Sequence, residues 1–165
     1  MNVILVGMPG CGKSTVGVVL AKVLGMHFCD TDIVIQERTG KRLQDIINAD
    51  GNDAFLKIEE DVLASLELDN TVISTGGSAV YSEKAMTHLK KSGVVVYLNV
   101  GAKEIERRLA DFAARGVAIK DGMTVLDLYN ERKPLYEKYA DVTVVAEGMD
   151  IPTVVSNISK EIENR

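Results

Sequence analysis

The chain has 165 residues, of which 46% are hydrophobic and 26% are charged, and its formal net charge is −5 at pH 7. This length allows a sizeable buried core, and we expect a single domain over residues 1–165 and a monomer. The acidic balance argues against a general nucleic-acid-binding protein, whose surface is normally basic. No apolar run is long enough to cross a membrane, and no apolar leader precedes the first expected strand. We therefore expect a cytoplasmic protein without nucleic-acid or membrane partners, whose two cysteines are free thiols.

The hydrophobic pattern predicts short apolar strands that alternate with helices along the whole chain. The strands are expected at residues 2–6, 27–29, 71–74, 93–98 and 142–145. The helices are expected at residues 13–24, 31–38, 42–49, 53–66, 82–91, 102–112, 124–139 and 151–163. This alternation indicates an α/β protein with a five-stranded parallel sheet covered on both faces, a three-layer α/β/α fold. Ligands in such folds bind beyond the carboxyl ends of the strands.

A glycine-rich segment follows the first expected strand. Residues 7–14 read GMPGCGKS and match the pattern G-x-x-x-x-G-K-[ST] at every position. Between a strand and a helix, this pattern is typical of a phosphate-binding loop, whose backbone N–H groups and helix dipole attract phosphate oxygens. Lys13 can then reach the β- and γ-phosphates, and the Ser14 hydroxyl can ligate Mg²⁺. The segment predicts a nucleoside-triphosphate site, and a glycine-rich turn without a ligand is the alternative.

Two carboxylates and two glycines follow the next two strands. Asp30 and Asp32 come after the second expected strand, and Gly76 and Gly77 come after the third. One carboxylate can hold Mg²⁺ through water, and the other can orient or deprotonate a substrate hydroxyl. The simpler alternative is that one aspartate only caps the next helix, although capping and function are compatible. Since parallel strands end at one edge of the sheet, these groups predict an active site there.

The helical pattern breaks between Ala113 and Met123, where a glycine-containing stretch carries two cations, Arg115 and Lys120. Phosphoryl transfer needs exclusion of water and neutralisation of charge, which loops with arginine often supply. We therefore expect a mobile lid at about residues 112–123. The alternative is a solvated connector.

An ordered set of short motifs extends these observations from about residue 3 to residue 145. The motifs are the phosphate loop, Asp30-Thr31-Asp32, Arg38-Thr39-Gly40, Asp50-Gly51, Phe55-x-x-x-Glu59, Thr75-Gly76-Gly77 and Arg132-x-Pro134-Leu135-Tyr136. In its order and spacing this set resembles the shikimate kinases. The resemblance implies a P-loop fold like that of nucleoside monophosphate kinases. It also implies transfer of the ATP γ-phosphoryl group to the 3-hydroxyl of shikimate, in aromatic amino-acid biosynthesis.

On the donor side, the resemblance implies that the ATP phosphates are bound by Gly10, Cys11, Gly12, Lys13, Ser14 and Thr15. Ser14 would ligate Mg²⁺, and Asp30 would reach the ion through water. Arg115 would be the lid arginine over the phosphates. Lys13, Asp32 and Arg115 are accordingly the expected catalytic residues.

On the acceptor side, the resemblance implies that a small, anionic, hydroxylated compound binds against the helices at about residues 31–62. The implied acceptor-binding residues are Asp32, Glu59, Gly76, Gly77 and Arg132. Asp32 would contact the substrate hydroxyls and act as the base, and Gly77 would offer its backbone N–H. Arg132 would hold the carboxylate, a role that suits a planar guanidinium. The alternative for Arg132 is a solvated side chain in the charged run 130–133.

Two residues depart from the family pattern on this side. The motif normally reads F-R-x-x-E, and its arginine is a second clamp on the substrate carboxylate, but Leu56 occupies that position. Losing one charged hydrogen-bond partner costs about 1.5–3 kcal/mol. Lys57 lies about 100° around the helix, so it compensates only if the helix is rotated or its stem bends back. Glu59 loses its usual arginine partner, with Arg132 or a substrate cation as the alternatives, and Ser78 replaces the third glycine of the usual G-G-G.

These observations predict an ATP-dependent small-molecule kinase, with shikimate as the first acceptor to test. A kinase of another small hydroxy acid or polyol is an alternative, because the departures fall on the acceptor side. A nucleotide-binding regulator without catalytic activity is a second alternative. The presence of Lys13, Ser14, Asp30 and Asp32 argues against that regulator.

Overall fold

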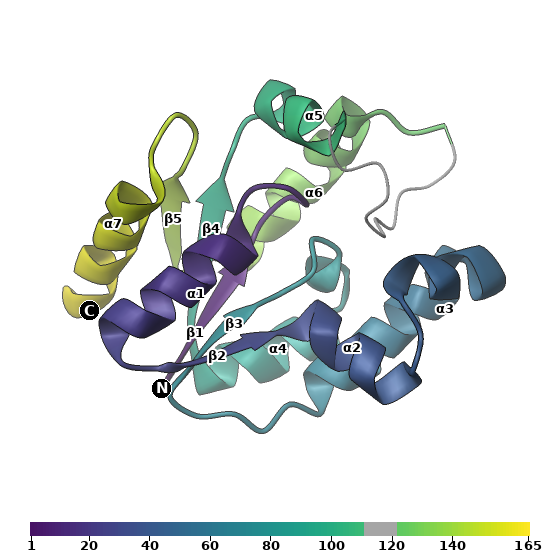
Figure 1. Ribbon diagram of the computed structural model, residues 1–165, viewed down its shortest axis with the longest axis horizontal. Helices are drawn as coiled ribbons and strands as arrows, with labels where there is room; N and C mark the ends of the chain where they lie inside the picture. Colours follow the sequence, from purple (N-terminus) through teal and green to yellow (C-terminus); the bar gives the residue numbers. More distant parts are fainter. Residues whose placement is uncertain (111–121) are drawn as a thin grey trace.

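The computed structural model describes residues 1–110 and 122–165 (Figure 1). Arg115 and residues 112–121 of the expected lid lie outside the described residues. The strands are β1 (Asn2–Val6), β2 (His27–Asp30), β3 (Thr71–Ser74), β4 (Gly93–Asn99) and β5 (Val142–Val145). They form one sheet in the order β2-β3-β1-β4-β5, and every neighbouring pair is parallel. The expected five-stranded parallel sheet is confirmed.

Helices cover both faces of this sheet. The helices are α1 (Lys13–Leu24), α2 (Thr31–Thr39), α3 (Leu43–Ala64), α4 (Glu83–Ser92), α5 (Ala102–Ala110), α6 (Val125–Tyr139) and α7 (Ile151–Glu163), with a short 3₁₀ helix, η1 (Ala79–Tyr81). The α1 and α7 helices contact each other on one face, and α4 and α6 pack against the other (Figure 1). The three-layer α/β/α arrangement is therefore confirmed. The sequence pattern did not predict η1.

Burial explains why the central strand β1 lacks an alternating pattern. The side chains of β1 from Val3 to Val6 are fully buried, because helices cover both sides of the strand. A second, smaller apolar cluster holds α2 and α3 together, and it consists of Ile35, Leu43, Ile46, Phe55 and Val62. In the described part of the chain, no helix has the length and apolarity needed to cross a membrane.

The α3 helix contains a sharp kink where the sequence predicts two helices. Gly51 has φ +86° and ψ 172°, which is outside the helical region and is accessible essentially only to glycine. The expected segments 42–49 and 53–66 are thus the two arms of one element that bends at this residue. The second arm carries Phe55 and Glu59, and Phe55 lines a cavity together with Lys13 and Asp32.

Replacing Gly51 by alanine tests this conformation. A Cβ at Gly51 meets no neighbouring atom within 4 Å, so the cost arises from the backbone angles alone. We expect Gly51→Ala to lower the free energy of unfolding by about 1–3 kcal/mol in a urea titration. Asp50→Ala, at the adjacent exposed position, is the control and should change it by less than about 0.5 kcal/mol. Equal stability of the two variants would contradict a strained turn at Gly51.

Candidate active site

The phosphate loop leaves the carboxyl end of β1 and opens α1. Gly12 is the residue before the first helical turn and has φ +97°, a left-handed conformation that glycine adopts without steric cost. Gly10 also has a positive φ, of +77°. These conformations turn the backbone between β1 and α1 so that the loop closes over the helix N-terminus, where the dipole favours an anion.

Lys13 and Ser14 begin α1 and lie at the centre of the loop. The Lys13 ammonium is buried and donates hydrogen bonds to the carbonyl oxygens of Gly7 and Met8, each at 2.8 Å. The Ser14 hydroxyl donates to Asp30 Oδ2 at 2.6 Å. The structure therefore brings the expected Mg²⁺ residues Ser14 and Asp30 into direct contact.

Asp30 also caps the next helix. Its Oδ1 accepts a hydrogen bond from the backbone N–H of Asp32 at 3.0 Å, at the start of α2. Capping by Asp30 is thus confirmed, and its other oxygen still faces Ser14. Burial raises the pKa of Asp32 to about 6, the charge of Asp30 adds to this rise, and the charge of Lys13 opposes it. Asp32 is therefore a carboxylate near neutral pH with a higher proton affinity than an ordinary aspartate.

Arg132 lies inside the molecule rather than in solvent. Its side chain comes from α6 and is 1% exposed, so the alternative of a solvated side chain is wrong. Arg132 Nε donates to the Tyr81 hydroxyl at 3.2 Å, and the guanidinium carbon lies 5.2 Å from the centre of the Tyr81 ring. A Cβ at Gly77 would stand 3.0 Å from Arg132 Nη1 and 2.8 Å from Pro9 Cδ, so this close approach requires glycine.

Glu59 is a buried carboxyl group beside this arginine. Its Oε1 accepts a hydrogen bond of 2.6 Å from the Ser78 hydroxyl. Burial raises the pKa of Glu59 to about 7, and the charge of Asp32 adds to this rise. The Ser78 hydrogen bond and the charges of Arg132 and Lys13 lower the pKa, but by less. The sequence left Arg132 or a substrate cation as the partner of Glu59, but its hydrogen-bond partner in the structure is Ser78.

Leu56 and Lys57 have different environments. Leu56 is partly buried and packs against the second apolar cluster. Lys57 is 63% exposed and forms ion pairs with Glu60 at 3.2 Å and Asp61 at 3.0 Å on the outer face of α3. Lys57 therefore does not take the place of the missing arginine in this structure.

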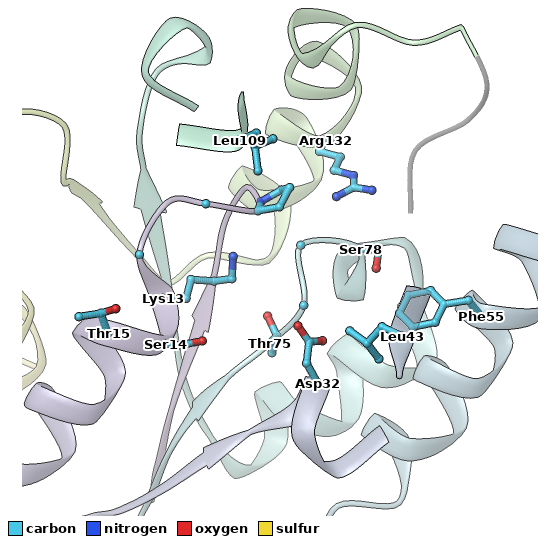
Figure 2. Close-up of a pocket in the computed structure, with 15 residues that line it drawn as sticks. Lys13, Ser14, Thr15, Asp32, Leu43, Phe55, Thr75, Ser78, Leu109 and Arg132 are labelled. Carbon is cyan, nitrogen blue, oxygen red and sulfur yellow. The ribbon is translucent and has the colours of Figure 1, made fainter. Parts of the chain in front are cut away.

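One cavity of about 160 Å³ brings Lys13, Ser14, Asp32 and Arg132 together, whereas Asp30 and Glu59 do not line it. It is lined by Pro9, Gly10, Gly12, Lys13, Ser14, Thr15, Asp32, Leu43, Phe55, Thr75, Gly76, Gly77, Ser78, Leu109 and Arg132. Figure 2 shows Lys13 and Asp32 at one part of this space, and Arg132 and Ser78 at another. The phosphate loop and the expected acceptor residues thus open into the same space.

Arg108 is a basic residue near the phosphate loop that the sequence pattern did not single out. Its Nη1 donates to the carbonyl oxygen of Gly10 at 3.1 Å, and its Nε donates to Glu104 at 2.9 Å. Arg108 also lines a second cavity with Cys11, Thr15 and other residues beside the loop. The sequence signal was weak, because cations in the last turn of a helix are common for their interaction with the helix dipole.

Comparisons with known proteins agree with this geometry. The family model described as shikimate kinase matches residues 9–163. A shikimate kinase from Mannheimia succiniciproducens is 37% identical over 167 residues, which cover 99% of this chain and 95% of that protein. The chain belongs to the shikimate kinase family. It is accordingly a small-molecule kinase that uses ATP as its co-substrate.

Solved structures of the family have the same fold as this chain. The structure of a shikimate kinase from Acinetobacter baumannii in complex with shikimate has a TM-score of 0.89 and 30% identity, covering 99% of this chain and 93% of that one. For a shikimate kinase from Aquifex aeolicus the TM-score is 0.86 and the identity 32%, with coverage of 99% and 97%.

The raised pKa of Glu59 predicts a pH-dependent stability. Because the folded state holds this proton more tightly than the unfolded chain, its stabilising contribution is complete below about pH 4.5 and is lost as the pH rises through about 7. The Glu59→Gln variant lacks this pH-dependent contribution, because a glutamine side chain does not ionise. We expect the stability of the wild type relative to Glu59→Gln to fall by about 2–3 kcal/mol between pH 4.5 and pH 8 in chemical denaturation.

Glu67→Gln is the control for this prediction, because Glu67 is exposed. Its stability difference from the wild type should change by less than about 0.5 kcal/mol over the same range. If the stability difference between the wild type and Glu59→Gln changed equally little with pH, the pKa of Glu59 would not be raised in the folded protein.

Proposed function

We propose that this kinase transfers the γ-phosphoryl group of ATP to the 3-hydroxyl of shikimate and releases ADP. The observation that carries the proposal is the single cavity into which the phosphate loop, Asp32 and the buried Arg132 all open. A carboxylate on Arg132 and a hydroxyl beside Asp32 then bind at the same time as a phosphate chain on the loop. Shikimate has both a carboxylate and hydroxyls, and the family membership supports it as the acceptor.

At the donor end, the phosphates of ATP bind to the backbone N–H groups of residues 10–15. Lys13 moves from the carbonyl oxygens of Gly7 and Met8 to the β- and γ-phosphates, whose negative charge attracts the ammonium more strongly. Ser14 and Asp30 fit a Mg²⁺ site, since both supply oxygen and lie 2.6 Å apart. When bound, the ion would neutralise charge on the phosphate oxygens, with Ser14 as its ligand and Asp30 reaching it through water.

The nucleoside end of ATP fits the second cavity beside the phosphate loop. This cavity runs from Cys11 and Thr15 to the segment that precedes and opens α7, and it includes Arg108 and Met149. An aromatic base stacks favourably on the plane of a guanidinium group, so Arg108 is a suitable contact. We therefore add Arg108 to the proposed nucleotide-binding residues.

At the acceptor end, Asp32 accepts the proton of the 3-hydroxyl as the oxygen–phosphorus bond forms and the bond between the γ-phosphorus and the β,γ-bridging oxygen breaks. Burial and the neighbouring Asp30 make Asp32 a better proton acceptor than an exposed aspartate. Arg132 binds the carboxylate and so fixes which hydroxyl faces Asp32. Gly77 brings its backbone close to Arg132, where its N–H can contact the acceptor.

The acceptor specificity is tested by ADP release with purified protein, Mg²⁺, ATP and a panel of hydroxy acids and polyols. We expect turnover with shikimate, and none with a Lys13→Ala variant, which controls for contaminating kinases. Turnover with another hydroxy acid but not with shikimate would contradict the proposed substrate and favour a related kinase. ATP binding without turnover of any acceptor would contradict the proposed reaction.

Restoring an arginine at position 56 should strengthen acceptor binding. Leu56 lines a cavity with Ser78 and Tyr81, next to the acceptor site, so a longer cationic side chain from this position can approach the carboxylate. We expect Leu56→Arg to lower the KM for shikimate about 10-fold and to leave the KM for ATP unchanged. Leu56→Met, which is long but uncharged, is the control. If both variants gave the same KM, the absent arginine would not limit carboxylate binding.

A further inference from the structure

Ser78 makes a contact that a glycine at this position could not make. Its hydroxyl donates a 2.6 Å hydrogen bond to Oε1 of Glu59, and both residues are buried, with exposures of 6% and 2%. The backbone of Ser78 precedes η1, but its hydroxyl does not cap that helix. Its hydrogen bond therefore serves Glu59.

The second carboxyl oxygen of Glu59 lies next to two residues that line the acceptor cavity. Among the described residues, Glu59 Oε2 is buried without a hydrogen-bond partner. It lies 2.6 Å from the point where a Cβ of Gly76 would stand, and Asp32 Oδ1 lies 3.0 Å from the same point. Asp32, Gly76 and Ser78 all line the acceptor cavity (Figure 2). A buried polar atom normally has a hydrogen-bond partner, and a hydroxyl of the acceptor or a water bound with it can supply a donor from the adjacent cavity.

We propose that Ser78 is a positioning residue for acceptor binding. In the absence of an arginine at position 56, it holds Glu59 by Oε1 and thereby keeps Oε2 beside Asp32 and Gly76 at the acceptor site. This inference rests on the proposed function, because it concerns the same acceptor site. The two departures from the family pattern are then coupled. Leu56 stands where the usual arginine partner of Glu59 would be, and Ser78, in the loop after β3, donates a hydrogen bond to Glu59 instead.

The test is a double-mutant cycle of the wild type, Ser78→Ala, Leu56→Arg and the double variant, with steady-state kinetics for shikimate and ATP. We expect Ser78→Ala to raise the KM for shikimate about 10-fold, with kcat and the KM for ATP within about 2-fold of the wild type. In the Leu56→Arg background, Ser78→Ala should change this KM less than about 2-fold, because the guanidinium takes over Glu59.

Two further variants separate positioning from a general loss of stability. Ser78→Thr retains the hydroxyl and should keep the KM for shikimate near that of the wild type. Ser82→Ala removes a hydroxyl that donates to Glu60 in the following segment, and it should leave this KM unchanged. An unchanged KM in Ser78→Ala, or an equal increase in both backgrounds, would overturn the inference.

A measurement without substrates keeps the inference testable if shikimate is not the acceptor. Carbon NMR of the Glu59 carboxyl group gives its titration midpoint in the same four proteins. Asp32, Arg132 and Lys13 face Glu59 and are retained in all four, so the cycle isolates the Ser78 hydrogen bond. Ser78→Ala should raise the midpoint by about one pH unit with Leu56 present, and should not raise it in the Leu56→Arg background.

The kinetic measurements and the NMR titration together distinguish a failure of the role proposed for Ser78 from a failure of the proposed function. A midpoint that Ser78→Ala leaves unchanged would overturn the positioning role, whichever acceptor the enzyme uses. An absence of turnover with shikimate in every variant, together with the expected change in midpoint, would overturn the proposed substrate and leave the role of Ser78 supported.

Discussion

The register of the three strands β1, β2 and β3 is the constraint on which the whole site depends. Ser74 of β3 pairs with Leu5 of β1 and with Asp30 of β2, so the three strands end at the same level. The phosphate loop, the turn at Asp30 and the loop after β3 therefore leave the sheet at one edge. A slip of one residue in β2 would turn its side chains to the other face and separate Asp30 from Ser14.

The acceptor end of the site depends on a balance of buried charges. Arg132, Asp32 and Glu59 lie close together where the low dielectric strengthens their mutual interactions. The buried guanidinium favours an anionic acceptor, and the two carboxyl groups favour hydroxyl donors over a further anion beside them. With Leu56 in place of a second arginine, we expect acceptor recognition to depend more on hydroxyl contacts than on paired charges.

The sequence predicted the strongly patterned parts of the molecule and missed contacts that depend on tertiary packing. The strands β1, β3 and β4 were predictable because most of their residues are buried between the two helical layers and form continuous apolar runs. The phosphate loop was predictable because its spacing of glycine, lysine and serine is rare outside phosphate-binding loops. By contrast, the burial of Arg132 depends on Tyr81, a residue 51 positions away in the chain. The hydrogen bond from Ser78 to Glu59 likewise joins residues 19 positions apart, and although the sequence predicted the break in α3 near Gly51, it did not predict this contact.

The most direct test of the shared donor and acceptor site is a crystal structure with Mg²⁺, a non-hydrolysable ATP analogue and shikimate. We predict the triphosphate on the loop over residues 10–15, the shikimate carboxylate on Arg132, and the 3-hydroxyl within hydrogen-bond distance of Asp32. A carboxylate bound away from Arg132, or a hydroxyl nearest the γ-phosphate that lies beyond the reach of Asp32, would contradict a shared donor and acceptor site.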